Sequence, residues 1–507
     1  MPENSKTSGE KSSASYRSWP AIAAGIAIPC LYLFGLTMPL VGPDEPRYAQ
    51  VAREMYERGD WITPTLGGFN WFEKPALLYW LEIAAYKVFG VTEFSARLGS
   101  ALFGLGTVAS LWLIAKIASA ADHSSQNRRF ANWTALIAAS TIGIIVFSRG
   151  ASFDIILTFP ITAALGGFFA YDRCQEKRER MLGLFVFYFF IGIAVLAKGL
   201  VGIVFPFAIV GLYFAIMLKR PSRQFFFSLP LGVLLILAVT ATWYLPMYLR
   251  HGYAFIDEFF VQHHFQRFTS NKYSHPQPFY FFFWVLPLMM IPWLPFFAAA
   301  IWNWSKDLRM SISAGSPKPD NGLRFFSAAW IAVPLLFFSF SGSKLPGYIL
   351  PCVPGAILLT AEFVIRWIGE IKRRKVIVEA VAAGTFVVVI AAMFVIVPSF
   401  ANADSVKFLI AAANERGYEQ AEVVSLHTIS HNAEFYASGR IVRTPDGKQK
   451  RLYGPTEVLQ EIEARGRKTM LVLVPLEYVD QLRTADYLNA EIIADNGELA
   501  IAAVRSK

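Results

Sequence analysis

The sequence repeats long runs of roughly twenty residues that carry almost no charge, the length that a helix needs to cross a membrane. Only 17% of the residues are charged, whereas soluble domains carry about 25%. This composition excludes an ordinary soluble protein and predicts an α-helical polytopic membrane protein with about 11–13 transmembrane helices. The eleven clearest runs are 19–41, 94–117, 130–148, 153–171, 182–198, 200–218, 225–249, 279–304, 325–341, 348–367 and 376–398.

The positions of the basic residues predict the orientation of the chain. The formal net charge is +10, but the cations gather in short clusters between apolar runs, which is typical of membrane topology and argues against a nucleic-acid partner. If the N-terminus is cytoplasmic, every cytoplasmic loop is basic, as the positive-inside rule requires. The clusters are Arg128 and Arg129; Arg173, Lys177, Arg178 and Arg180; Lys219, Arg220 and Arg223; and Arg366, Lys372, Arg373, Arg374 and Lys375.

The chain divides into three parts. Residues 1–18 are polar and Ser-rich, and we expect a disordered cytoplasmic tail. Residues 19–398 form the membrane domain, with long outer loops at 42–93 and 250–278. Residues 399–507 read as a small outer α/β domain with a docking or lid role, because EVVSL, TMLVLVPL and AEIIADNGELAIAAV predict strands and TEVLQEIEARGRK predicts a helix ending near Gly466.

The first outer loop begins with GPDEPRYAQVAREMYERGDW and holds more charge than topology requires. Pro46 suits the first turn of a helix and Gly59 its end. A second helix is predicted from Pro75 to Gly90, just after the pair Glu73 and Lys74. Its apolar face is expected to lie at the membrane surface; that face consists of Leu77, Leu78, Leu81, Ala84, Ala85 and Val88.

Three further segments place polar residues at the outer side. Asp154, in SRGASFD, is a carboxylate at a membrane boundary, which indicates either a functional group or a helix N-cap. The segment DEFFVQHHFQRF carries His263, His264 and Arg267; an imidazole with Glu73 would suit zinc or manganese, although interfacial polar residues explain it equally well. In SGSKLPGYILP, Lys344 is either a phosphate ligand or a snorkelling lysine.

These motifs resemble the aminoarabinose lipid A transferases, which are grouped with protein O-mannosyltransferases among the GT-C membrane glycosyltransferases. The resemblance rests on DEPRYAQVAREMYERGDWITPTLGGFNWFEKPALLYWL, SRGASFD and SGSKLPGYILP, and it covers roughly residues 19–360. It implies an enzyme of the bacterial inner membrane that moves a sugar from undecaprenyl phosphate to lipid A or another envelope glycolipid on the periplasmic side. It also implies a GT-C fold and contact with membrane lipids. The cofactor that it suggests is a divalent metal ion (zinc, manganese or magnesium).

The resemblance and the local chemistry together predict the site residues. The aspartates Asp44 and Asp154 match the active-site acids of the family, Glu73 a metal-contacting acid, Lys74 a residue holding the carrier phosphate, and Tyr348 a pocket tyrosine. The full prediction is Asp44, Glu45, Arg47 and Asp154 in catalysis; Lys74, Arg267, Lys344 and Tyr348 at the donor phosphate; Tyr48 and Arg149 in the substrate pocket; and Glu73, His263 and His264 at the metal.

Two other classes of protein stay open at this point. A lipid-linked sugar transporter or flippase would place its charges near the middle of the bilayer, often within inverted repeats, and neither feature is visible in the sequence. A scaffolding protein would leave the first outer loop unexplained. Within the enzyme class, a protein or glycan acceptor would use the same kind of site as lipid A.

Overall fold

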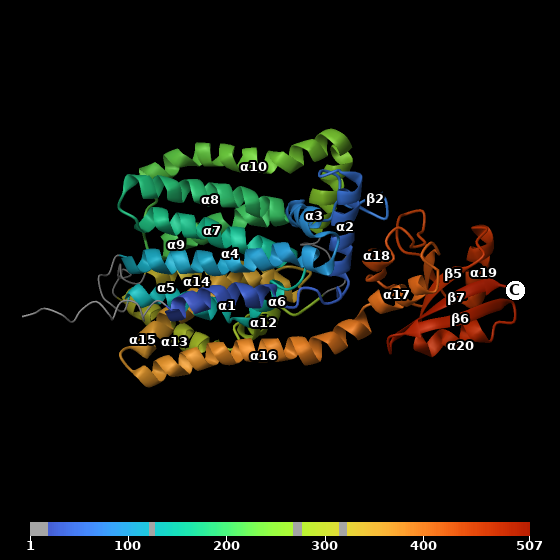
Figure 1. The fold of residues 1–507 in the computed structure, drawn as a ribbon. Helices are drawn as coiled ribbons and strands as arrows, with labels where there is room; N and C mark the ends of the chain where they lie inside the picture. Colours follow the sequence, from blue (N-terminus) through green and yellow to red (C-terminus); the bar gives the residue numbers. More distant parts are fainter. Residues whose placement is uncertain (1–18, 121–126, 267–275, 314–321) are drawn as a thin grey trace, which may run out of the picture.

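The computed structural model describes residues 19–120, 127–266, 276–313 and 322–507. Long helices form a bundle, and a smaller domain built from the C-terminal residues caps one end of it (Figure 1). In the described residues, seven segments are each long and apolar enough to cross a membrane. They are α4 (Glu93–Ala120), α7 (Phe153–Arg173), α8 (Lys177–Lys198), α10 (Arg223–Ile256) with the π-helical η1 (Asp257–Gln266), α14 (Gly322–Ser339), the 3-10 helix η3 (Pro346–Cys352) with α15 (Val353–Ile368), and α16 (Lys372–Asp404).

The other four predicted runs form shorter or interrupted helices. They are α1 (Trp19–Leu33), α5 (Asn127–Ala139) with α6 (Ile142–Phe147), α9 (Val201–Ile216), and α12 (Phe281–Met289) with α13 (Leu294–Ser313). The two interruptions lie against each other: the Ile142 N–H donates to the Ile291 carbonyl at 2.9 Å, and Trp293 Nε1 donates to Ser140 Oγ at 3.1 Å. Backbone groups freed inside an apolar bundle need such partners. Each of the eleven predicted runs is therefore helical.

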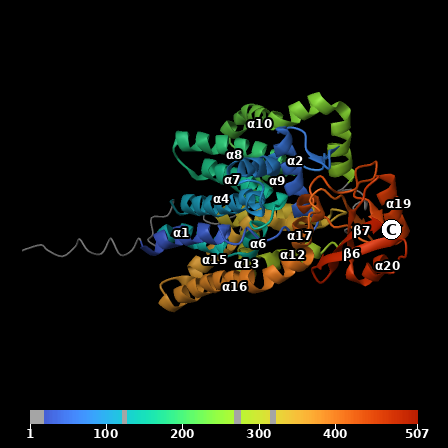
Figure 2. The same ribbon diagram turned by 45° about the vertical axis from the view of Figure 1, so that its right-hand side comes forward.

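The first outer loop folds at the same end of the bundle as the C-terminal domain (Figures 1 and 2). It contains α2 (Asp44–Arg58), the strands β1 (Thr65–Leu66) and β2 (Phe69–Asn70), and α3 (Leu77–Phe89). The predicted helix ends are confirmed, since Gly59 and Gly90 follow the two helices with φ of 67° and 76°. The β1–β2 hairpin was not predicted, although Gly67-Gly68 is a two-residue turn sequence with φ of 63° and 82°.

The predicted membrane-surface face of α3 is wrong. Leu77, Leu78 and Ala85 are buried inside the protein, and of the predicted face only Ala84 and Val88 are exposed. The helix packs against α2 on one side and α4 on the other. Apolar residues at helical spacing indicate a buried face but do not tell lipid from protein as its neighbour.

The C-terminal domain is a mixed sheet covered by short helices, as predicted. The strand order is β4-β3-β5-β7-β6, with parallel pairing among the first three strands and antiparallel pairing among the last three. The elements are α17 (Lys407–Glu415), β3 (Val423–Leu426), α18 (Ala433–Tyr436), β4 (Arg451–Leu452), α19 (Pro455–Ala464), β5 (Met470–Pro475), η4 (Leu476–Tyr478), α20 (Val479–Arg483), β6 (Leu488–Asp495) and β7 (Leu499–Ser506). The final hairpin turns at Asn496-Gly497, where the sequence predicted it.

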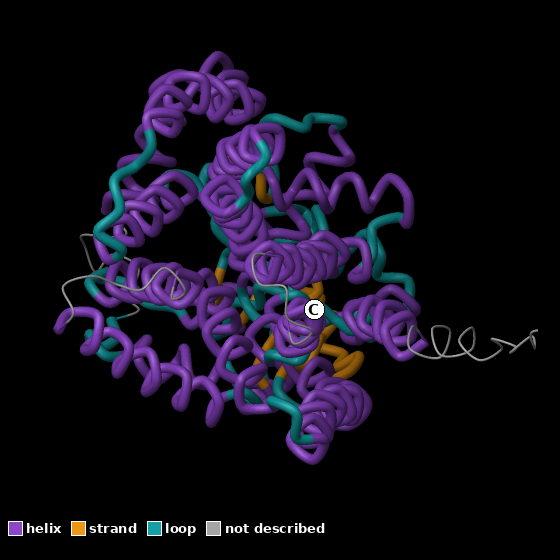
Figure 3. Tube along the Cα trace, turned by 90° about the vertical axis from the view of Figure 1, so that its left-hand side faces the viewer, coloured by secondary structure: helices purple, strands orange, loops and turns teal. Residues whose placement is uncertain are grey.

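The two ends of the bundle differ in character. The starts of α5, α8 and α10 and the turn between α15 and α16, which carry the basic clusters, lie at the end opposite α2 and the C-terminal domain (Figure 1). Seen from that basic end, the helices run toward the viewer with the strands behind them (Figure 3). The helix α16 runs along one edge of the bundle and passes directly into the C-terminal domain. It continues to Asp404, beyond the domain boundary predicted after residue 398.

Candidate active site

A cavity of about 790 Å³ lies where α2 meets the ends of the membrane helices. Both polar and apolar side chains line it, from the segment between α1 and α2, the start of α2, the α6–α7 turn, the end of α8, η3 and α16. The predicted site residues that line it are Asp44, Glu45, Tyr48, Lys74, Arg149, Asp154 and Tyr348. The fold therefore brings together residues as far apart in the sequence as Asp44 and Tyr348.

Asp44 is the more accessible of the two predicted active-site aspartates. It is the first residue of α2, and its side chain is 50% exposed. The Arg47 guanidinium, one turn along the helix, pairs with it and also donates to the Pro43 carbonyl at 2.8 Å. Burial disfavours the charge on Arg47, but the carboxylates of Asp44 and Glu73 more than offset this and raise its pKa. Arg47 thus stays charged and holds the Asp44 carboxylate in place.

Glu45 is buried and fully bonded, which corrects its predicted catalytic role. Its two oxygens receive Arg97 Nε at 2.6 Å and Nη2 at 2.7 Å, and also the N–H groups of Val41 at 3.0 Å and Ala151 at 2.9 Å. Arg97, which the sequence analysis missed, donates in addition to the carbonyls of Leu36, Met38 and Pro39. Because every lone pair of this carboxylate is in use, we expect Glu45 to position the chain before α2.

Asp154 forms an ion pair with Lys198, the second residue that sequence reasoning missed. Both side chains are less than one-fifth exposed. The Lys198 ammonium also lies over the Tyr348 ring, 4.7 Å from its centroid. Asp154 is not the N-cap of α7, because Ser152 caps that helix by accepting from the Asp154 N–H at 3.2 Å. A lysine ending an apolar run was the available signal for this site.

Gly347 allows η3 to approach this ion pair. A Cβ at this position would lie 1.9 Å from Asp154 Oδ2. The SKLPGY motif therefore needs its glycine for close packing against the active-site carboxylate, and the following Tyr348 is delivered to the cavity as predicted.

Two further cations face the cavity, and its remaining wall is apolar. Lys74 and Arg149 both line it, and the Arg149 guanidinium donates to the backbone carbonyls of Leu31 and Phe34. The apolar wall comes from α16; its members are Val388, Val389, Ala392, Met393, Val397 and Phe400. The cavity thus has charged side chains near α2 and an apolar wall along α16.

Lys344 does not reach this cavity, which corrects its prediction as a phosphate ligand. Its side chain is buried, and its ammonium donates to the carbonyls of Ser341 at 2.7 Å and Gln277 at 3.0 Å. Burial lowers the pKa of this lysine. Lys344 therefore fastens the chain before η3 to the segment before α12.

Glu73, the predicted metal residue whose side chain the structure describes, does not line the cavity. Glu73 interacts electrostatically with Arg47 and with a second carboxylate, Glu258 of η1, which accepts from the Phe72 N–H. Among the described residues, no three His, Cys, Asp or Glu side chains converge on one point. The side chains of His263 and His264, and the whole of Arg267, fall outside the described part of the chain.

The C-terminal domain is docked onto the segment that leads to Asp44. The Gly42 N–H donates to Asp404 Oδ2 at 2.7 Å, and the Leu40 N–H donates to the Tyr436 hydroxyl at 2.8 Å. That hydroxyl in turn donates to Glu93 Oε1 at 3.1 Å, and Lys407 pairs with the same carboxylate at 2.6 Å. The C-terminal domain thus contacts the first outer loop directly, and its docking or lid role stays a prediction.

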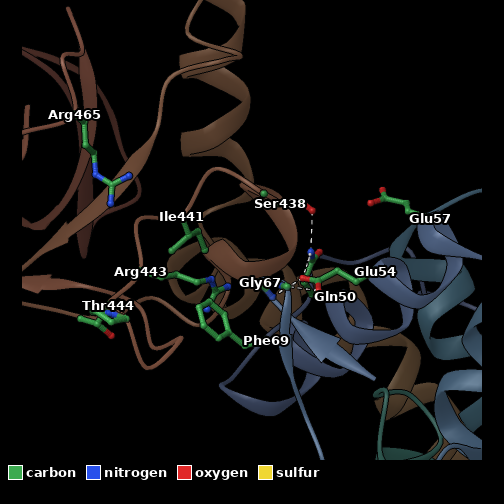
Figure 4. A pocket seen from close by; sticks show the side chains of 13 residues that line it. Gln50, Glu54, Glu57, Gly67, Phe69, Ser438, Ile441, Arg443, Thr444 and Arg465 are labelled. Carbon is green, nitrogen blue, oxygen red and sulfur yellow. Dashed lines mark hydrogen bonds between the residues drawn. The ribbon is translucent and has the colours of Figure 1, made fainter. Parts of the chain in front are cut away.

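A second cavity, of about 550 Å³, lies at this junction. Figure 4 shows Gln50 of α2 donating to Ser438 Oγ, at 2.8 Å, and Gly67 of the hairpin next to Arg443. A Cβ on Gly67 would lie 1.9 Å from Arg443 Nε. The β1–β2 hairpin is thus seated directly on the C-terminal domain.

Comparisons with known proteins agree with the resemblance seen in the sequence. The chain is 32% identical over 321 residues to an undecaprenyl phosphate-alpha-4-amino-4-deoxy-L-arabinose arabinosyl transferase of Photorhabdus laumondii, covering 63% of this chain and 55% of the relative. The Serratia proteamaculans transferase of the same name is 29% identical over 373 residues, covering 73% of this chain and 63% of the relative. The chain thus spans between 55% and 63% of the length of these two relatives.

The fold matches solved membrane glycosyltransferase structures. The structure of ArnT from Cupriavidus metallidurans bound to undecaprenyl phosphate aligns with a TM-score of 0.75 at 20% identity, covering 96% of this chain and 98% of that one. The archaeal oligosaccharyltransferase AglB from Archaeoglobus fulgidus aligns with a TM-score of 0.54 at 12% identity, covering 91% and 70%. These likenesses confirm the predicted GT-C fold of a multi-pass membrane protein.

The family model for dolichyl-phosphate-mannose-protein mannosyltransferases matches residues 17–299. This match contains α2, α3 and the Asp154–Lys198 pair, and it spans more than half of the 507 residues. The protein belongs to the dolichyl-phosphate-mannose-protein mannosyltransferase family.

Proposed function

We propose that this protein transfers a sugar, aminoarabinose or a close relative, from undecaprenyl phosphate to lipid A or another envelope glycolipid. The observation that carries the proposal is the cavity in which Asp44, Asp154, Lys74, Arg149 and Lys198 meet an apolar wall from α16. Cations suit the phosphate of a lipid-linked sugar, and the wall suits its polyprenyl chain. The named relatives act on undecaprenyl phosphate-linked aminoarabinose, which fits this arrangement.

The cations act on the leaving group. When the bond from the sugar to the phosphate breaks, negative charge grows on the phosphate oxygens, and Lys74 and Arg149 stabilise it from the cavity wall. Lys198 is committed to Asp154 and Tyr348, so it acts by fixing their positions. Because the energy of transfer is stored in the sugar–phosphate bond, no nucleotide site is required outside the membrane.

The carboxylates act on the sugar. Sugar transfer passes through a state with positive charge on the ring, which a nearby carboxylate stabilises. Asp44 is accessible and held by Arg47, so we assign it this role. A phosphate acceptor is already ionised at neutral pH and needs little proton removal, whereas a hydroxyl acceptor would require Asp44 as the general base.

The proposed location is the bacterial inner membrane, with a cytoplasmic N-terminus and a periplasmic C-terminal domain. The separation of the basic clusters from α2 and the C-terminal domain supports this orientation. The charged groups of the cavity also lie at one end of the bundle, whereas a transporter would place them at the bilayer midplane.

A divalent ion, whether zinc, manganese or magnesium, remains part of the proposal. Glu73 and Glu258 are two carboxylates in electrostatic contact, a pair that a cation would stabilise, and His263 and His264 belong to the same helical segment as Glu258. When bound, the ion would supply positive charge near the leaving phosphate.

The test is transfer by the purified protein. We expect wild-type protein in nanodiscs to transfer aminoarabinose from undecaprenyl-phosphate-aminoarabinose to lipid A. Mass spectrometry should show lipid A heavier by one aminoarabinosyl residue, with release of undecaprenyl phosphate. Asp44→Asn and Lys74→Ala should each lower kcat/KM by roughly 10²-fold, since each removes one charge from the site. Matched controls on the same loop, Glu57→Gln on α2 and Lys87→Ala on α3, should stay within about twofold of wild type because surface positions tolerate substitution.

Each failure of this test has a distinct meaning. Equal product from all variants would show that the cavity is not the active site. No product from folded wild-type protein would reject this donor and acceptor pair. The family model describes protein mannosyltransferases, so a Ser/Thr peptide is the second acceptor to offer. A hydroxyl acceptor of this kind would require Asp44 as the general base.

A further inference from the structure

His431 belongs to the part of the C-terminal domain that lies against the start of α2. It precedes α18 (Ala433–Tyr436), and α18 packs on α2. The neighbouring Asn432 is nearly fully buried, and its Nδ2 donates to the Asp404 carbonyl at 3.0 Å and to Asp404 Oδ2 at 3.3 Å. Since Asp404 Oδ2 also accepts from the Gly42 N–H, the His431 backbone is tied to the residue two positions before Asp44.

Further contacts on both sides keep this arrangement rigid. Tyr436 holds Leu40 before α2, Arg53 Nη1 donates to the Phe435 carbonyl at 3.4 Å, and Gln50 holds Ser438 (Figure 4). These contacts involve the C-terminal end of α18 and Ser438 just after it, one turn of α2 and the segment before α2. The position of His431 relative to α2 is therefore set by hydrogen bonds on several elements.

The charged groups that act on His431 are those of the active site. On α2 these are Asp44 and Arg47; Glu73 acts on Arg47 from the first outer loop, and Asp404 lies behind Asn432. Partial burial, followed by the charge of Arg47, lowers the pKa of His431, and Asp44 opposes this shift. The imidazole is consequently neutral at pH 7, where it adds no charge to the Asp44–Arg47 pair.

We propose that His431 is a positioning residue of the transferase site, supplied by the C-terminal domain where it docks at the start of α2, and that its ring helps to keep Asp44 paired with Arg47. A proton on the ring would place a second cation beside Asp44, compete with Arg47 for the carboxylate and draw it away from the sugar. The active site is then built from both domains. This inference rests on the proposed function only for its effect on rate, because the juxtaposition itself can be tested without the reaction.

The first experiment measures the titration of His431 by NMR in protein labelled at the histidine rings. The signal is identified by its loss in His431→Gln. Asp44→Asn should lower the pKa of His431 and Arg47→Gln should raise it, each by at least roughly half a unit, because an opposite charge favours the imidazolium and a like charge disfavours it. If neither variant moves the titration, His431 does not lie beside the pair and the proposal is wrong.

The second experiment follows the pH dependence of transfer. Wild-type kcat should fall as the pH drops through the pKa of His431, and His431→Gln, which hydrogen-bonds but cannot take a proton, should remove this loss. His431→Lys, a permanent cation, should lower kcat at neutral pH by about tenfold. His427→Gln is the control, because His427 lies in the same domain but bonds to Gln481; it should keep the wild-type profile.

The two experiments separate the possible failures. The NMR titration could shift as expected while kcat and the pH profile stay unchanged in His431→Gln and His431→Lys. That result would reject the positioning role of His431 but confirm that it lies beside Asp44 and Arg47. An inactive wild-type protein would reject the proposed donor and acceptor, and the NMR titration alone would then decide whether the C-terminal domain completes the site.

Discussion

At the scale of single residues, two buried glutamates of the first outer loop differ in whether their carboxylates have partners. Glu45 is paired with Arg97 and accepts from two backbone N–H groups. Glu82 of α3 is fully buried, and neither of its oxygens has a hydrogen-bond partner among the described residues. Burial, followed by the charge of Glu45, raises the pKa of Glu82 well above its ordinary value. One buried acid therefore has a cationic partner, whereas the other has none and favours its protonated form.

This difference predicts how stability depends on pH. A buried acid with a raised pKa takes up a proton on folding, so stability is greatest below its ordinary pKa of about 4.3 and declines as the pH rises toward the folded value. Across that window we expect wild type to lose about 1.4 kcal/mol per pH unit relative to Glu82→Gln. Unfolding midpoints in detergent from pH 5 to pH 8 measure this; parallel curves for the two proteins would contradict it, and Glu57→Gln is the exposed control.

At the scale of elements, α2 is the piece that organises the site. Its first turn carries Asp44 and Glu45, which the positive end of the helix dipole stabilises. Arg97 lies on a different helix, α4, and pairs with Glu45. Its guanidinium also donates to three backbone carbonyls of the segment before α2. The start of α2 is thus fixed by an ion pair from another helix.

The buried ion pair gives an element-scale prediction. Arg97→Met leaves the Glu45 charge buried without its partner and should cost 3–5 kcal/mol, roughly, in unfolding free energy, whereas adding Glu45→Gln should restore part of the loss. The exposed pair of Arg53 and Glu57 on the same helix is the matched control, and Arg53→Met should cost about 1 kcal/mol or less. A double-mutant cycle by denaturant unfolding measures both; equal costs would refute the special role of Arg97.

At the scale of the whole molecule, the outer end of the bundle is shared between two domains. The helix α16 supplies the apolar wall of the cavity, continues into the C-terminal domain and ends at Asp404, which binds Gly42. The membrane domain and the C-terminal domain are therefore linked both covalently and by the docking contacts around Leu40 and Gly42.

Tyr436→Phe tests this linkage. The hydroxyl accepts from the Leu40 N–H and donates to Glu93, so its loss leaves a partly buried N–H unpaired at a cost of about 1–3 kcal/mol. We expect faster hydrogen exchange of the amides at residues 40–42 and a lower kcat, with little change in the membrane helices. The control is Tyr453→Phe, at an exposed tyrosine of the same domain, which should leave the hydrogen exchange unchanged. If Tyr436→Phe also leaves the exchange unchanged, the docking contacts do not restrain the site.

The sequence alone determined the elements of this protein. Apolar runs located the helices of the bundle, Gly59 and Gly90 marked the ends of α2 and α3, and the final two strands and their turn were predicted. These signals act between residues close in the chain. The cavity residues Asp44, Lys74 and Asp154 came from motif and resemblance. Which charges meet depends on the packing of the helices. Arg97 lies 52 residues from Glu45, Lys198 lies 44 from Asp154, and Tyr436 lies 396 from Leu40. Such pairs depend on how helices pack, and no local pattern encodes them.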